Sequence, residues 1–194
     1  VGKMTGAEIM NYGVGGTRIA RNSAPSPDPS FDEDFLRRAE KMDKQADLVF
    51  VFGGTNDYGH GDAPIGEISD ETPYTFYGAM NLLVCYLEKF YDRDKICFIL
   101  PIHRKNEDNL FGDGSKKTKS GTLTDYINAE TEVLNDDNIH YLDLRKFFPI
   151  EKLDELTIDG LHPNAKGHML IAEKIVSYIR KYYITQQNSF AFGF

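Results

Sequence analysis

The stretch from Leu48 to Asp57, which reads Leu-Val-Phe-Val-Phe-Gly-Gly-Thr-Asn-Asp, decides the fold. Its first five residues are all apolar, as expected of a parallel strand that is covered on both faces. Two glycines and then Thr55, Asn56 and Asp57 follow at the carboxyl end of this strand. In open α/β sheets, functional sites lie at that end of the strands. The stretch therefore predicts a parallel sheet and the edge at which a site belongs.

Apolar strands and amphipathic helices alternate over the rest of the chain. Further strands are predicted at residues 7–14, 95–102 and 139–144. Apolar residues at helical spacing predict four helices. These helices are expected to begin at the capping box Ser30–Glu33, at Thr72 and Pro73, near Leu123 and after Asn164. The resulting order, β-α-β-α-β-α-β-α, indicates an α/β fold with parallel strands and right-handed crossovers.

Length and composition indicate one globular domain. The chain has 194 residues, enough for one hydrophobic core and short for two. Its net charge of −8, without a basic run, argues against nucleic acid and anionic membranes as partners. No apolar run approaches the roughly 20 residues that a membrane-spanning helix needs, so stable membrane insertion is not expected. The sequence does not distinguish a cytoplasmic from a secreted protein.

The two cysteines and the C-terminal tail give weaker signals. Cys85 falls in an apolar helical stretch and Cys97 in an apolar strand, so both are expected to be reduced core residues. An isolated disulfide between them is the alternative. Residues 185–194 form an aromatic tail with three phenylalanines, which is expected to pack on the domain or on a second copy in a homodimer.

The segment from Thr157 to Asn164 carries a second polar motif, with Asp159 three residues before His162. A histidine that acts as a general base needs a partner that fixes its tautomer and stabilises the imidazolium. A carboxylate held by the same short segment can do this, so the pair is typical of two members of a catalytic triad. The alternative is an ordinary loop that starts a helix, since Asp, Gly, Pro and Asn are common in loops.

Taken in order, three blocks resemble the SGNH (GDSL-type) hydrolase family: the glycine block Asn11–Thr17, the Gly53–Asp57 block and the Asp159–Pro163 block. Each motif alone is weak, but three in order are specific. The resemblance covers the chain from about Glu8 to the helix after Asn164. It implies a three-layer, flavodoxin-like parallel sheet of strand order 2-1-3-4-5, with helices on both faces.

The resemblance also implies roles for four residues. Gly16 matches the glycine whose backbone N–H helps to form the oxyanion hole, and Asn56 matches the asparagine whose side-chain amide completes it. His162 matches the catalytic base and Asp159 its orienting acid. The chemistry of the family requires no metal and no organic cofactor.

One block of the family is missing. Its nucleophilic serine lies in a Gly-Asp-Ser segment after the first, central strand, yet none of the fifteen residues before Gly16 is a serine. We therefore expect residues 1–194 to form a single SGNH hydrolase-like domain that is N-terminally incomplete. Roughly 20 to 35 further residues, with a buried strand and the Gly-Asp-Ser segment, are expected to precede Val1, which would give a typical domain length.

Several other polar groups are weaker candidates. Ser115 follows Gly112-Asp113-Gly114, but it lacks the preceding strand and following helix that hold a nucleophile. Asp57, His60 and Asp62 have poor spacing for a metal site. The long polar segment 105–121 is expected to be a lid or specificity loop. His103, Arg104, His140 and His168 are expected to be loop, strand-face or helix-surface residues.

The sequence thus predicts a serine ester hydrolase with a Ser-His-Asp triad and a Gly/Asn oxyanion hole. The family acts on acetylated sugars, short acyl esters, lysophospholipids and thioesters. Polar, aromatic-bearing loops favour a small acyl group on a carbohydrate as the substrate. The alternative is a non-catalytic carbohydrate- or ligand-binding domain that has kept the fold and lost its nucleophile.

Overall fold

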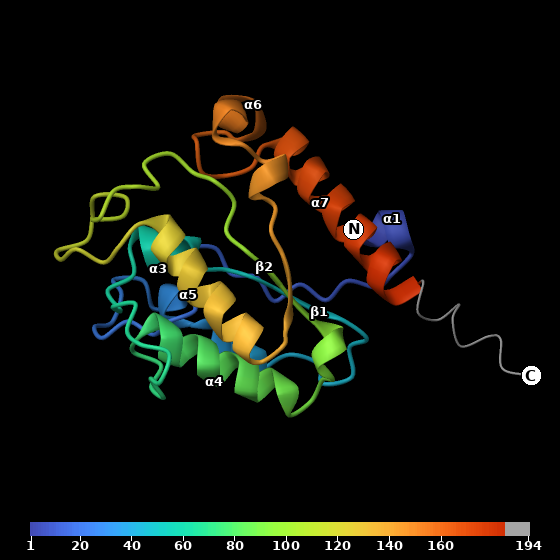
Figure 1. Ribbon diagram of the computed structural model, residues 1–194, viewed down its shortest axis with the longest axis horizontal. Helices are drawn as coiled ribbons and strands as arrows, with labels where there is room; N and C mark the ends of the chain where they lie inside the picture. The colour runs from blue at the N-terminus through green and yellow to red at the C-terminus, as the bar shows by residue number, and fades with distance from the viewer. Residues whose placement is uncertain (185–194) are drawn as a thin grey trace, which may run out of the picture. The chain divides into compact units, whose positions relative to one another are not determined.

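The computed structural model describes residues 1–184, which form short helices and a parallel sheet (Figure 1). In chain order the elements are α1 (Gly2–Thr5), η1 (Pro29–Asp32), α2 (Phe35–Glu40), β1 (Val49–Phe52), α3 (Thr55–Gly59), α4 (Phe76–Glu88), η2 (Arg93–Lys95), β2 (Ile96–Ile99), α5 (Leu123–Asp136), β3 (His140–Leu142), η3 (Arg145–Phe147), η4 (Ile150–Lys152), α6 (Leu153–Leu156), α7 (Ala165–Ile179) and η5 (Arg180–Ile184).

The chain divides into two compact units. Among the described residues, the first unit contains Val1–Asn11, His103–Lys105 and residues 144–184, including α6 and α7. The second contains Tyr12–Ile102 and Asn106–Asp143, with the whole sheet and helices α2 to α5. The glycine block from Tyr12 onward and the Gly53–Asp57 block therefore fold within the sheet-bearing unit.

The sheet has three parallel strands in the order β1-β2-β3. Val49 pairs with Ile96 and Cys97 pairs with His140, so the strands run in the predicted direction. Strand β2 is central and buried throughout, which explains its unbroken apolar sequence. Helices α4 and α5 make the two crossovers and lie side by side (Figure 1). The predicted parallel α/β fold is confirmed.

Apolar stripes on α4 and α5 form the core of the sheet-bearing unit. Phe76, Met80 and Leu83 of α4 are at most 2% exposed. The ring of Phe76 meets that of Tyr126 on α5 edge to face, with 5.1 Å between centroids. Burial of each such side chain is worth about 1.5–3 kcal/mol, so these stripes explain why both helices dock on the sheet. Thr122 and Asp125 form a capping box that starts α5.

The predicted strand at residues 7–14 is wrong. Within the described residues, the sheet pairs β1, β2 and β3 with one another and does not include this segment. Ile9 is 57% exposed and Val14 is 42% exposed. A strand is stabilised by a neighbouring strand that takes up its backbone hydrogen bonds, so the local sequence pattern alone does not make one.

Two predicted helix starts also lie a few residues from the observed ones. Ser30 falls in η1, which Asp28 caps, and α2 begins later, where the Asp34 carboxylate accepts the N–H of Arg37. Thr75 rather than Thr72 caps α4, because its hydroxyl accepts the N–H of Gly78. Several residues near each boundary have capping side chains, and tertiary packing selects among them.

The remaining expectations have mixed outcomes. Both cysteines are free thiols, but Cys85 is exposed and only Cys97 is buried, so the prediction of two core cysteines is wrong for Cys85. Among the described residues, no helix has the length and apolar character needed to cross a membrane. The aromatic tail, residues 185–194, lies outside the described residues.

Candidate active site

The loop that carries Asp159 and His162 is closed by its own hydrogen bonds, all within the first unit. Thr157 and Pro163 form an isolated antiparallel bridge, and the Ile158 N–H donates to the His162 carbonyl at 2.8 Å. Gly160 lies at the tip with a φ of +84°, a conformation that favours glycine. Its N–H donates to the hydroxyl of Thr157 at 2.8 Å. The loop is therefore a fixed turn rather than a loose connection.

This turn brings the two predicted catalytic residues into contact. His162 Nδ1 lies 2.8 Å from Asp159 Oδ2. The other carboxylate oxygen accepts the backbone N–H groups of His162 at 2.8 Å and Leu161 at 3.0 Å. These hydrogen bonds hold the pKa of Asp159 well below its usual range. The bond from the His162 N–H has the largest effect, and those from the His162 ring and the Leu161 N–H have smaller ones.

The same contact defines what the imidazole can do. An ionised carboxylate accepts only, so Nδ1 carries the hydrogen and Nε2 has a free lone pair. The side chain of His162 is 70% exposed, so Nε2 is open to a reacting group. This arrangement suits a general base whose cationic form is stabilised by an adjacent carboxylate.

Asn164 fixes the turn to the helix behind it. Its side-chain oxygen accepts the N–H groups of Lys166 and Gly167 and so caps α7. Its Nδ2 donates to the carbonyls of Glu155 at 2.7 Å and Thr157 at 3.2 Å. One side chain therefore joins α6, the turn and α7, and the predicted cap of this helix is confirmed.

The Gly53–Asp57 block turns sharply from β1 into α3 in the second unit. Gly54 precedes α3 with a φ of +90°. A Cβ on Gly53 would lie 2.5 Å from the ring of Phe35, so a larger residue there would displace that ring. Asn56 falls in the first turn of α3, and its Nδ2 donates to the carbonyl of Thr17 at 2.8 Å. A primary amide has two N–H groups, so one remains for a ligand.

Gly16 precedes Thr17 and has a left-handed backbone conformation. Its φ is +76°, and a Cβ there would lie 2.7 Å from the ring of Phe31. Its carbonyl is 3.2 Å from His60 Nε2. The contact between Asn56 and Thr17 thus joins the Gly53–Asp57 block to the glycine block, and both residues belong to the same unit. The family resemblance assigns the oxyanion hole to these two blocks. Asp159 and His162 belong to the other unit.

Asp57 has a role that the sequence did not reveal. Its carboxylate is buried and accepts the backbone N–H groups of Ile19 at 3.0 Å and Ala20 at 2.8 Å. Burial raises its pKa to about 6, although these hydrogen bonds act in the opposite direction. Asp57 therefore fastens the segment that follows Gly16 to α3. Its position directly after Asn56 was the only available signal.

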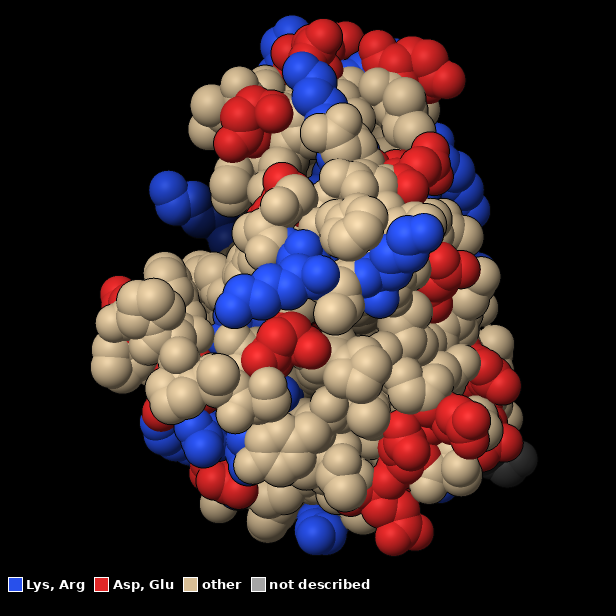
Figure 2. Space-filling model, turned by 90° about the vertical axis from the view of Figure 1, so that its left-hand side faces the viewer, with Lys and Arg blue, Asp and Glu red and all other residues tan. Residues whose placement is uncertain are grey.

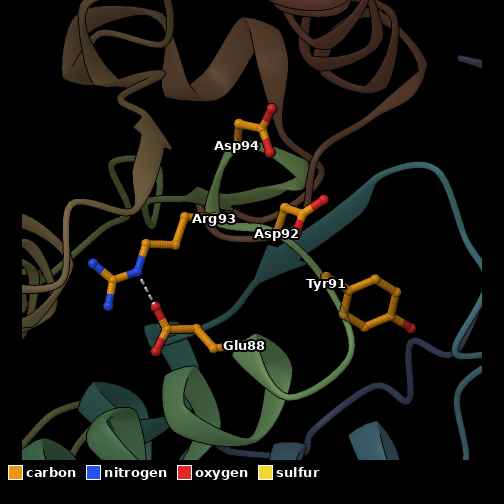
Figure 3. A pocket seen from close by; sticks show the side chains of 5 residues that line it. All are labelled: Glu88, Tyr91, Asp92, Arg93 and Asp94. Carbon is orange, nitrogen blue, oxygen red and sulfur yellow. Dashed lines mark hydrogen bonds and ion pairs between the residues drawn. The ribbon is translucent and has the colours of Figure 1, made fainter.

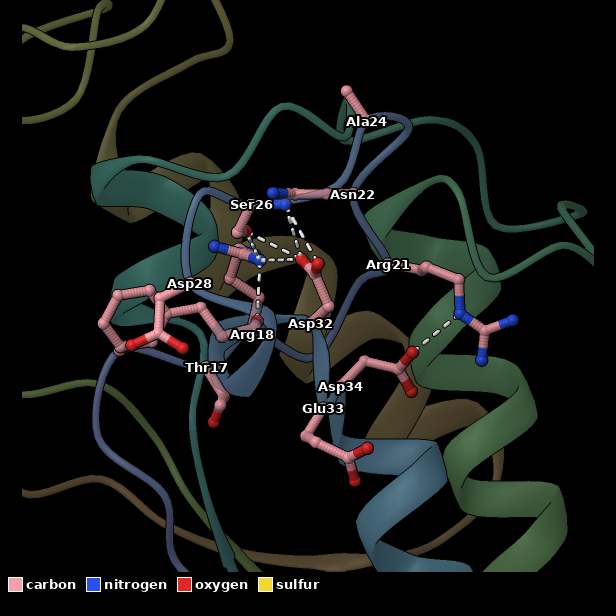
Figure 4. Close-up of polar contacts among 12 residues, drawn as sticks. Thr17, Arg18, Arg21, Asn22, Ala24, Ser26, Asp28, Asp32, Glu33 and Asp34 are labelled. Carbon is pink, nitrogen blue, oxygen red and sulfur yellow. Dashed lines mark hydrogen bonds and ion pairs between the residues drawn. The ribbon is translucent and has the colours of Figure 1, made fainter.

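A polar network holds the rest of this segment in place (Figure 4). The buried Arg18 donates to the Phe31 carbonyl at 2.8 Å and lies 3.6 Å from the carboxylate of Asp32. The Asp32 carboxylate also accepts the N–H of Ser26. Arg21 Nε donates to Asp34 at 2.7 Å. These contacts tie residues 17–34 together around the glycine block.

The weaker polar candidates either have other hydrogen-bond partners or are exposed. Asp62 accepts the backbone N–H and hydroxyl of Ser23. Ser115 is exposed on the 105–121 segment. Within residues 1–184, no group of three His, Cys, Asp or Glu side chains is arranged to hold a metal ion. His140 and His168 are exposed, on β3 and α7 respectively.

A hollow of about 620 Å³ lies in the sheet-bearing unit, next to the amino end of β2 (Figure 3). Its walls come from the end of α4 and the turn before β2, and they consist of Glu88, Tyr91, Asp92, Arg93 and Asp94. Arg93 forms an ion pair with Glu88. These residues precede β2, whereas Asn56 follows β1, so the hollow lies at the amino ends of the strands, away from the edge expected to carry a site.

Comparison with solved structures supports the fold. A crystal structure of a protein from Lactobacillus plantarum superposes with a TM-score of 0.70 and 28% identity, over 87% of this chain and 78% of that one. A putative GDSL-like lipase from Bacteroides ovatus has a TM-score of 0.54 and 25% identity, over 86% and 68% of the two chains. An acetyl xylan esterase has a TM-score of 0.55 and 21% identity, over 86% and 78%.

No curated protein matches the chain. The sequence model of one family does match, the GDSL-like Lipase/Acylhydrolase family, over residues 1–170. This match spans the glycine block, the Gly53–Asp57 block and the turn with Asp159 and His162. The α/β fold with its parallel three-stranded sheet agrees with the SGNH hydrolase fold. The chain therefore belongs to the GDSL-like lipase/acylhydrolase family, and hence to the hydrolase class.

Proposed function

We propose that the protein is a serine ester hydrolase in which His162 is the general base and Asp159 its orienting acid. The observation that carries this proposal is the 2.8 Å contact between His162 Nδ1 and Asp159 Oδ2. It leaves Nε2 free to accept a proton, and Asp159 stays ionised to stabilise the imidazolium that forms. The serine is proposed to come from a segment outside residues 1–194, as the family resemblance implies.

The reaction has two steps. The serine Oγ attacks the ester carbonyl, and its proton passes to His162 Nε2. The tetrahedral intermediate collapses as His162 returns that proton to the departing alcohol, which leaves an acyl-enzyme. Water then attacks the acyl group, with His162 again taking and returning the proton, and the carboxylic acid is released.

We assign the oxyanion hole to the Gly16 N–H and the second N–H of the Asn56 amide. The first N–H of Asn56 is committed to the Thr17 carbonyl, which orients the amide. Gly16 has a positive φ, and a side chain at this position would meet the ring of Phe31, so the position favours glycine. Fixed donors of this kind lower the barrier by about 2.7–4 kcal/mol each, because they need no reorganisation during the reaction.

The substrate is proposed to be a small acyl ester, with an acetylated carbohydrate as the first class to test. Basic and acidic side chains are interspersed on the face drawn in Figure 2. This pattern, with the net charge of −8, suits a neutral substrate better than a polyanion. Asn106, Asn109 and Asp113 lie on the segment that packs against α3 and supply polar groups of the kind that contact sugar hydroxyls.

The test is the replacement of His162 in the full-length protein. His162→Ala should lower kcat for p-nitrophenyl acetate and for an acetylated xylo-oligosaccharide by about 10³-fold or more, because the proton transfer is lost. His168→Ala, on the exposed face of α7, is the matched control and should retain activity. Equal activity of both variants would refute the assignment of the base. A wild-type protein that binds the sugar without hydrolysing it would be a binding domain instead.

A further inference from the structure

The polar segment from Asn106 to Ser120 is packed against α3 in the sheet-bearing unit. The hydroxyl of Tyr58 on α3 donates to the carbonyls of Asn106 and, at 3.1 Å, Asn109. The N–H of Asp113 donates to the carbonyl of Gly59 at 2.9 Å. A Cβ on Gly112 would lie 2.1 Å from that same carbonyl, so the two backbones are in close contact. The segment expected to be a lid is fastened to the helix that carries Asn56.

Lys116 connects this segment both to α3 and to the buried core. Its Nζ donates to the carbonyl of Asp57 at 2.7 Å, to Ser120 Oγ at 2.8 Å and to the hydroxyl of Tyr126 at 3.0 Å. These three acceptors use all three hydrogens of an ammonium group. The Nζ also lies 4.9 Å from the centroid of the Tyr126 ring, in cation–π contact. Tyr126 is 1% exposed and belongs to the core, so Lys116 joins α3 to a rigid anchor.

Helix α3 needs such support because it is short. It has five residues, and an isolated helix of this length is unstable in water. Its last carbonyls have no partners within the helix, and a lysine near a helix C-terminus stabilises them. Asn56 lies one residue before Asp57, so a shift of the Asp57 carbonyl would move the Asn56 amide as well.

We propose that Lys116 is a positioning residue for the oxyanion hole, which holds α3 so that the Asn56 amide points at the reacting oxygen. The effect of Lys116 on catalysis rests on the proposed function. Its role in holding α3 in place is independent of that function. Burial lowers the pKa of Lys116 to about 8, although the nearby carboxylates of Asp57, Asp113 and Asp62 act in the opposite direction. Its neighbours Lys117 and Lys119 are exposed.

The first test compares Lys116→Met with Lys117→Met in the full-length protein. Lys116→Met keeps an unbranched side chain that is one atom shorter and removes the donors, and it should lower kcat about 10- to 100-fold with KM changed less than threefold. Lys117→Met should match the wild type in both constants. Tyr126→Phe removes one acceptor and keeps the ring, so it should lower kcat by a smaller factor even if Lys116→Met does not fold.

A double-mutant cycle with Asn56→Ala separates positioning from a general effect. If Lys116 acts through Asn56, Lys116→Met should cost less than threefold in kcat once Asn56 is alanine. The same factor in both backgrounds would overturn the inference.

Amide hydrogen exchange provides a readout that does not require turnover. The N–H groups of Tyr58 and His60 are bonded to the carbonyls of Gly54 and Asn56, and they should exchange at least about 10-fold faster in Lys116→Met than in Lys117→Met. Unchanged exchange would refute the clamping of α3 by Lys116. If the wild type hydrolyses no ester, the proposed function fails, and hydrogen exchange alone decides whether Lys116 holds α3.

Discussion

His162 and Asp159 depend on one eight-residue turn for their geometry. The carboxylate of Asp159 uses one oxygen for two backbone N–H groups and the other for the imidazole. The backbone contacts fix the acid, and the acid fixes the base. The spacing Asp-x-x-His already predicted this contact, since a turn with glycine at its tip returns the chain over three residues.

Asp159→Asn should reduce activity without unfolding the turn. The asparagine oxygen can still accept the N–H groups of Leu161 and His162, which leaves its NH₂ group facing His162 Nδ1. That arrangement favours the tautomer with the hydrogen on Nε2, and a protonated Nε2 cannot accept the proton of the nucleophile. We expect kcat for p-nitrophenyl acetate to fall about 10²- to 10⁴-fold with little change in the melting temperature. A kcat within threefold of wild type would show that Asp159 does not orient the base.

Asp57 predicts a pH dependence of stability. Its pKa is about 6 in the folded protein, against an ordinary value of 3.8, so between about pH 4 and pH 6 the folded protein retains a proton that the unfolded chain loses. The stability contributed by Asp57 therefore falls as the pH rises through this window. The difference in unfolding free energy between wild type and Asp57→Asn should shift by roughly 2 kcal/mol from pH 4 to pH 7, to the disadvantage of the wild type. Urea unfolding at several pH values measures this, and a constant difference would contradict it.

At the scale of elements, the sequence pattern predicted the helices and strands whose position follows from the local spacing of apolar residues. Helices α4, α5 and α7 and strands β1, β2 and β3 were all predicted from their apolar patterns. For α4, α5 and β2 the apolar residues are the buried ones, whereas His140 and Tyr141 of β3 are exposed. Residues 7–14 failed because a strand also requires a neighbouring strand, which is not a property of the segment itself. The clamp on α3 was missed for a related reason, since Lys116 is 59 residues from Asp57.

Asn164 should matter for stability and for the turn at once. Asn164→Ala removes the cap of α7 and two hydrogen bonds to the carbonyls of Glu155 and Thr157, so a loss of about 1–2 kcal/mol or more is expected. Asn164→Asp keeps an acceptor for the cap and loses the two donors, which isolates the cap contribution. Urea unfolding should rank the wild type first, then Asn164→Asp, then Asn164→Ala. If Asn164→Ala matches the wild type, the side chain does not join α6, the turn and α7.

At the scale of the whole molecule, family membership and fold agree with the sequence prediction, and the four proposed site residues form two pairs, one in each unit. Asp159 and His162 are in direct contact in one unit. In the other unit, Asn56 contacts the residue after Gly16. The spacing within one turn predicted the contact between Asp159 and His162. Asn56 and Thr17 are 39 residues apart, so the association of Asn56 with the glycine block followed from the family resemblance and not from local sequence.

Labelling of the full-length protein with a fluorophosphonate, which forms a covalent adduct with an activated serine, is the decisive experiment for the proposed mechanism. We expect one adduct by intact mass, located by peptide mapping at a serine outside residues 1–194. We also expect His162→Ala to slow the labelling greatly while His168→Ala does not, since the base must activate the nucleophile. A wild-type protein that forms no adduct, or one that is labelled equally fast without His162, would contradict the proposal that this protein is a serine hydrolase with His162 as its base.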